Sequence, residues 1–76
     1  MENFDQELDL SGLNCPLPIL RAKKALKTLS QGNVIHIITT DPGSLKDFEA
    51  FSRQTGNELL SAQEGEGEYH FLIRRS

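Results

Sequence analysis

The only cysteine of the 76-residue chain, Cys15, stands before two closely spaced prolines in the stretch Gly12-Leu13-Asn14-Cys15-Pro16-Leu17-Pro18. Proline restricts the residue before it to extended backbone angles, so Pro16 gives Cys15 the conformation of a helix N-cap residue. Pro16 then takes the first helical position, where its missing N–H costs no hydrogen bond. The spacing predicts a helix that begins at Pro16, with the thiol at its positive end.

A sulfur atom at this position would meet the N–H of Leu17, because Pro18 at the third position has no N–H to donate. The helix dipole favours an anion at the N-terminus by about 0.3–1 kcal/mol, rising to roughly 2 in partly buried sites. Since one pKa unit corresponds to about 1.4 kcal/mol, we expect the dipole to lower the thiol pKa by up to roughly one and a half units from about 8.5. This context predicts a reactive thiolate or persulfide at Cys15, against the alternative of an inert, buried cysteine.

The remaining chemistry-bearing residues do not suggest a complete enzyme. His36 and His70 fall within expected strands, so we interpret both as sheet residues and not as catalytic bases. No base or oxyanion-hole motif accompanies Cys15 from which a self-sufficient hydrolase could be built. One cysteine and two distant histidines also lack metal-ligand spacing, and we expect no cofactor. A lone activated thiol suits a carrier that accepts sulfur from one protein and surrenders it to another, without turnover of its own.

Composition bounds the classes of protein that this chain can represent. Its length predicts a single domain over residues 1–76, with 37% apolar residues, as in an ordinary globular protein. Eight basic against eleven acidic residues give a net charge of −3, which opposes direct binding of nucleic acid. No apolar run could span a membrane, and the first residues lack the pattern of a signal peptide. We therefore expect a cytoplasmic protein with a free thiol and no membrane association.

The apolar pattern predicts the element order βαβαββ. Expected strands cover 7–10, 34–39, 58–62 and 68–75, and expected helices cover 16–30 and a segment that ends near Gly56. Two starts of the second helix remain open: Asp41 as cap with Pro42 following, or Ser44 as cap with Asp47 three residues later. Its expected inner face consists of Leu45, Phe48, Phe51 and Ser52. Glycines within 63–67 allow a tight reversal between the last two strands.

Helical periodicity divides the first helix into two faces. The inner face is expected to hold Ala22, Ala25, Leu26 and Leu29. The outer face is expected to hold two leucines near the cysteine and three bases, namely Leu17, Leu20, Arg21, Lys24 and Lys27. Exposed apolar groups rimmed by positive charge suit the docking of a partner protein with an acidic rim, although the same residues could merely solvate the helix.

In its motifs and their order the chain resembles the TusA (SirA-like) family of sulfur carriers. The resemblance rests on Leu8-Asp9, Gly12-Leu13-x-Cys15-Pro16-x-Pro18, the basic amphipathic helix, Gly32, an apolar strand, Asp41-Pro42 and the ending Phe71-Leu72-Ile73-Arg74-Arg75. It covers nearly the whole chain, and the Cys-Pro-x-Pro motif is the hallmark of the family. It implies a two-layer α/β sandwich in which a four-stranded mixed sheet carries two helices on one face.

The resemblance also implies a function. In this family the cysteine that matches Cys15 takes sulfane sulfur as a persulfide from a cysteine desulfurase or a rhodanese-like donor and relays it to an acceptor protein. Gly12, Pro16 and Pro18 would shape the site. The acceptor pathway would be transfer-RNA thiolation, sulfur oxidation, cofactor assembly or thiosulfate use. Leu17 stands where the transfer-RNA branch carries an acidic residue, so a partner with an apolar contact beside Cys15 fits better.

Two function classes therefore compete on the sequence. The first is a sulfurtransferase-like carrier, expected as a monomer that meets a donor and an acceptor protein. The second is an interaction module that binds a partner through Leu17, Leu20, Lys24 and Lys27, with the thiol as a redox sensor. Formation of a persulfide on Cys15 distinguishes the two.

Overall fold

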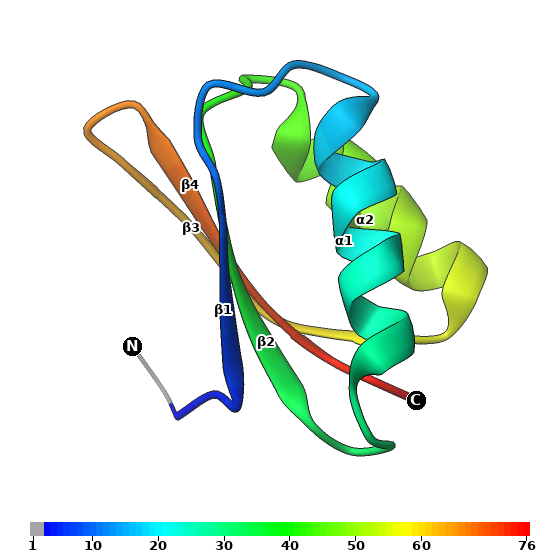
Figure 1. Ribbon diagram of the computed structural model, residues 1–76. Coiled ribbons are helices and arrows are strands. Elements are labelled where there is room, and N and C mark those ends of the chain that lie inside the picture. Colours follow the sequence, from blue (N-terminus) through cyan, green and yellow to red (C-terminus); the bar gives the residue numbers. More distant parts are fainter. Residues whose placement is uncertain (1–2) are drawn as a thin grey trace.

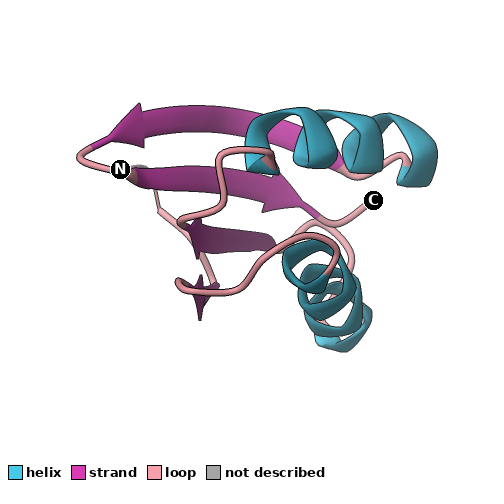
Figure 2. Ribbon diagram, turned by 90° about the horizontal axis from the view of Figure 1, so that it is seen from above, coloured by secondary structure: helices cyan, strands magenta, loops and turns pink. Residues whose placement is uncertain are grey.

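A computed structural model, which describes residues 3–76, shows a sheet on one side and two helices on the other (Figure 1). The elements follow the predicted order, with the bounds β1 Gln6–Leu10, α1 Leu17–Thr28, β2 Val34–Thr39, α2 Ser44–Thr55, β3 Glu58–Gly65 and β4 Glu68–Arg74. Both helices pack on the same face of the sheet, and Figure 2 shows this arrangement from above. The predicted two-layer α/β sandwich is confirmed.

The mixed sheet has the strand order β1-β2-β4-β3. β1 pairs with β2 in parallel, whereas β4 lies antiparallel to both β2 and β3. Each helix therefore connects two strands that run in the same direction, and the order advances across the sheet in one sense. Right-handed crossovers of this kind place both helices on one face, and they make β2 a central strand.

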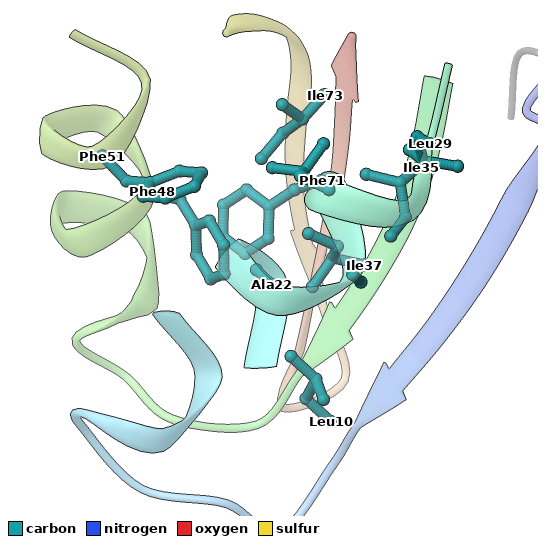
Figure 3. Packing of buried hydrophobic residues seen from close by; sticks show 11 residues of the cluster. Leu10, Ala22, Leu29, Ile35, Ile37, Phe48, Phe51, Phe71 and Ile73 are labelled. Atoms are coloured by element: carbon teal, nitrogen blue, oxygen red, sulfur yellow. The ribbon is translucent and has the colours of Figure 1, made fainter. Parts of the chain in front are cut away.

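The hydrophobic core fills the space between the helices and the sheet (Figure 3). Ala22, Ala25, Leu26 and Leu29 of the first helical segment are buried, as their spacing predicted. Phe48 of α2 packs against Phe71 of β4 with ring centroids 4.7 Å apart. Alternation along the strands places every second side chain in this layer, and the remaining ones face away from the helices.

The second helix differs from the prediction at its start. Its N-cap residue is Gly43 and no side chain caps it, so neither Asp41 nor Ser44 plays the expected role. Both side chains have other partners: the Thr39 hydroxyl donates to Ser44 Oγ at 2.7 Å, and Asp41 accepts from the N–H of Cys15 at 3.0 Å. Leu45 was also placed wrongly, because 40% of it is exposed. Phe48 and Phe51 are buried, as predicted.

The two C-terminal strands form a longer hairpin than the sequence indicated. β3 extends to Gly65, so the reversal is confined to Glu66 and Gly67. Both residues have positive φ, 53° and 79°, as a two-residue hairpin turn requires. The far face of this hairpin carries His70, which lies against His36 of β2.

Candidate functional site around Cys15

The site lies at the end of the sheet where the C-termini of β1 and β2 lie side by side. Leu10 pairs with Thr39 in the parallel ladder, so the segments that follow the two strands leave the sheet side by side. The first segment carries Cys15 into α1, and the second carries Asp41 into α2. Parallel pairing thus brings together residues that are 26 positions apart in the sequence.

Two hydrogen bonds hold these segments together. The Gly12 N–H donates to Thr40 Oγ1 at 2.8 Å, and the Cys15 N–H donates to Asp41 Oδ2 at 3.0 Å. Gly12 has a φ of 83°, a left-handed conformation that glycine adopts without steric cost. Cys15 itself is exposed, as the reactive interpretation requires. Gly12 therefore allows the turn after β1 that presents the thiol to solvent.

The predicted start of α1 is wrong by one residue. Pro16 is the N-cap and Leu17 is the first helical residue, so Pro18 takes the second position. The peptide bond between Cys15 and Pro16 is cis. The Leu17 N–H donates to the Asn14 carbonyl at 2.9 Å, which closes a turn before the helix. Leu17 therefore has no free N–H for the sulfur, because the backbone turn already uses it.

The predicted direction of the Cys15 pKa shift is also wrong. The Asp47 carboxylate, above all through its negative charge, raises the thiol pKa above its ordinary value of 9.0, and a smaller contribution comes from Asp41. The helix dipole alone would lower the pKa, but the two carboxylates raise it because a nearby like charge disfavours the thiolate.

A surface cavity of about 190 Å³ opens beside the thiol, between the two helices. It is lined by Cys15, Pro16, Ile19, Asp47, Ala50, Phe51 and Gln54. Asp47 is the only acidic or basic residue in this set, which is otherwise largely apolar. The cavity can admit a small side chain or a sulfur-bearing group next to Cys15.

The outer face of α1 follows the prediction. Leu17 and Leu20 are 43% and 54% exposed, and Arg21, Lys24 and Lys27 are exposed as well. Arg21 and Lys24 line a different hollow, against Gln6 and Leu8 of β1. Arg21 and Lys24 therefore lie apart from the cavity at Cys15, whereas Lys23 and Lys27 line a hollow between the two helices that shares Phe51 with it.

Sequence reasoning missed the two carboxylates as members of the site. From the sequence, Asp41 is a possible cap of the second helix and part of the Asp41-Pro42 motif, and Asp47 is only a partner of the Ser44 cap. A parallel pairing of 7–10 with 34–39 would have placed Asp41 beside the cysteine, but the strand order was unassigned. Nothing in the local sequence around Asp47 indicates that it faces Cys15.

Other kinds of site are not formed by the described part of the chain. Among residues 3–76, no group of three or more His, Cys, Asp or Glu residues could hold a metal ion. Neither α1 nor α2 is long and apolar enough to cross a membrane.

The described chain is thus a small α/β sandwich that presents one exposed cysteine at a proline-flanked helix start. A family model described as sulfurtransferase TusA matches residues 6–75. The sulfur carrier protein TusA of Allochromatium vinosum is 66% identical over 76 residues, covering all of both chains. That of Pseudomonas entomophila is 41% identical over 71 residues, covering 93% of this chain and 89% of its own. The chain belongs to the TusA family of sulfur carriers.

A solved structure agrees with this assignment. The SirA-like protein of Desulfitobacterium hafniense superposes with a TM-score of 0.80 at 25% sequence identity, over 92% of this chain and 96% of its own. The predicted resemblance to the TusA (SirA-like) family is confirmed.

Proposed function

We propose that Cys15 carries sulfane sulfur as a persulfide, which it receives from a donor protein and passes to an acceptor protein. The observation that carries this proposal is the exposed thiol of the only cysteine, whose backbone N–H donates to Asp41 where β1 and β2 leave the sheet. Gly12, Pro16 and Pro18 shape this presentation. Membership of a sulfur-carrier family supports it.

The chemistry needs no metal or organic cofactor. The Cys15 thiolate attacks the terminal sulfur of a donor persulfide, the donor S–S bond breaks, and the donor thiolate leaves and takes up the proton that Cys15 lost. The net change converts Cys15–SH and R–S–SH into Cys15–S–SH and R–SH, with no net oxidation. The second transfer is the same step with Cys15 as donor.

The donor is proposed to be a cysteine desulfurase or a rhodanese-like protein. The exposed Leu17 and Leu20, flanked by Arg21, Lys24 and Lys27, would form the docking surface beside the sulfur. The apolar Leu17 fits an acceptor outside the transfer-RNA branch better than one within it. The relay is placed in the cytoplasm, where a reducing environment preserves a free thiol.

The test is intact-protein mass spectrometry after incubation with a cysteine desulfurase and cysteine. We expect the wild type to gain the mass of one sulfur atom, reversibly with reductant, and Cys15→Ser to gain none. Leu72→Val, a buried change on the far side of the sheet, is the matched control and should load like the wild type. Absence of loading in the wild type, with thiosulfate and a rhodanese also tried, would favour the redox-sensitive interaction module.

A further inference from the structure

The electrostatic surroundings of Cys15 differ from those expected of a reactive cysteine. Asp41 approaches from the segment after β2 and accepts the Cys15 N–H at 3.0 Å. Asp47 approaches from the first turn of α2 and shares the 190 Å³ cavity with the thiol. Activated cysteines ordinarily lie beside cations or a histidine, which stabilise the thiolate. Here two carboxylates from two elements lie close to the same cysteine.

These carboxylates have no cation of their own. The ion pairs within residues 3–76 are His36 with Glu7, His70 with Glu68, and Arg74 with Glu58, and none involves Asp41 or Asp47. No basic residue lines the cavity. On the nearest helix, α1, Arg21 and Lys24 line a hollow against β1, while Lys23 and Lys27 line a separate hollow near the end of α2. Asp41 and Asp47 are half-buried and have no ion-pair partner among residues 3–76, so their negative charge beside the cysteine is open to a partner's cation.

We propose that Asp47, assisted by Asp41, selects the sulfur partners of Cys15 by charge: the thiol stays unreactive until a partner brings a cationic group to the cavity. This inference rests on the proposed function and names the chemistry of the partner site. The partner carries a lysine or arginine beside its own reactive sulfur, and that cation pairs with Asp47 when the proteins dock. The partner also contacts Leu17 with apolar groups and places acidic groups opposite Lys24 and Lys27, so the two surfaces are complementary.

The selection acts on both transfers. During loading, Cys15 must become a thiolate before it can attack, and both carboxylates raise its pKa. During unloading, an acceptor thiolate attacks the terminal sulfur and Cys15 leaves as the thiolate, which meets the same repulsion. A cation at Asp47 offsets that repulsion in each step. Between encounters, the neutral thiol resists capture by small oxidants and disulfides, because the thiolate is the reactive form.

The test uses three small disulfides in place of the unidentified partner: cystamine, which is cationic, hydroxyethyl disulfide, which is neutral, and dithiodiglycolate, which is anionic. Each reacts with the Cys15 thiolate to form a mixed disulfide and release one thiolate. Because Cys15 is the only cysteine, mass spectrometry follows a single site. The variants are Asp47→Asn and the conservative Asp47→Glu. Glu49→Gln, an exposed change on the same helix, is the control of equal charge.

We expect the wild type to react at least several-fold faster with cystamine than with dithiodiglycolate at pH 7. Asp47→Asn should react several-fold faster with the neutral disulfide than the wild type does. The ratio of its rates with cystamine and with dithiodiglycolate should be smaller, and the pH profile of its rate should shift to lower pH. Asp47→Glu should retain much of the preference, and Glu49→Gln should behave like the wild type. Equal rates for all three reagents, or the same response in Asp47→Asn and Glu49→Gln, would overturn the proposal.

A second measurement separates this inference from the proposed function. The same variants are loaded by a cysteine desulfurase and cysteine at limiting enzyme. We expect Asp47→Asn to load more slowly than the wild type although it reacts faster with the neutral disulfide, and a merely structural role would not give opposite changes. If Asp47→Asn loads like the wild type, the charge selection is wrong while the carrier function stands. If no protein loads but the disulfide preference holds, the carrier function is wrong and the charge selection stands.

Discussion

Two regions of the molecule place carboxylates around a histidine or a cysteine, but the carboxylates have ion-pair partners among the described residues in only one of them. On the sheet face away from the helices, Glu7 Oε1 lies 3.0 Å from His36 Nδ1, and His36 Nε2 lies 2.9 Å from His70 Nδ1. His70 Nε2 lies 3.1 Å from Glu68 Oε1, which completes a hydrogen-bonded row across three strands. At the other region, Asp41 and Asp47 face Cys15.

The two regions differ in whether the negative charge of the carboxylates has a partner within the described chain. In the histidine row each carboxylate has an imidazole partner within the chain, and His36 is buried, with 5% of it exposed. At the Cys15 site the carboxylates face a thiol at the protein surface and lack an ion-pair partner among residues 3–76. Internally satisfied charge contributes to the stability of the fold, whereas unsatisfied charge at the surface remains available to a partner.

The largest expected effect is on stability, at the histidine row. His36→Ala removes a buried ring and leaves the Glu7 carboxylate and His70 Nδ1 without their partner, so we expect the free energy of unfolding to fall by about 2–4 kcal/mol. Cys15→Ala, at an exposed position, should change it by less than about 0.5 kcal/mol. Urea denaturation measures the free energy of unfolding of both variants. Similar losses of stability in the two would contradict the prediction.

The next effect distinguishes the two carboxylates of the Cys15 site. Asp41 accepts the N–H groups of Cys15 and of Gly43, at 3.0 and 3.3 Å, so it also holds the two segments together. Asp41→Ala should therefore lower the free energy of unfolding by about 1–2 kcal/mol. Asp47→Ala should cost less, since no side-chain hydrogen bond to the backbone depends on it. A larger loss of stability in Asp47→Ala than in Asp41→Ala, measured in the same urea titration, would contradict this prediction.

The smallest effect concerns an exposed carboxylate that is satisfied locally. The Ser11 hydroxyl and the Ser11 N–H both donate to Asp9 Oδ1, at 2.6 and 3.0 Å, and they lower the Asp9 pKa below its ordinary value of 3.8. A lowered pKa contributes stability above the unfolded-state value, and this contribution is lost as the pH falls through the folded-state value.

Ser11→Ala should therefore raise the Asp9 pKa toward 3.8 and remove a small contribution to stability at pH 7. An NMR titration of the Asp9 carboxyl carbon measures the shift. An unchanged pKa would show that the hydroxyl does not contribute, and Ser76→Ala, at an exposed position far along the chain, serves as control.

Much of the fold could be predicted from local patterns. The alternation at 7–10, the β-branched run at 34–39 and the helical spacing of Ala22, Ala25 and Leu26 each indicated an element whose bounds the structure confirms within a few residues. The wrong predictions about the helices concern their starts and Leu45. The expected caps of the second helix, Asp41 and Ser44, have tertiary partners that compete with the local role.

The sequence by itself determined the element order, the buried face of the first helix and the presence of one thiol at a helix start, because these depend on periodicity and on restrictions between neighbouring residues. Only the tertiary structure decided the charge around that thiol. Parallel pairing of β1 with β2 brings Asp41 to Cys15 across 26 residues, and the start of α2 at the same edge adds Asp47. The field at the sulfur sums over all charges nearby in space, so the local helix dipole could not predict its sign.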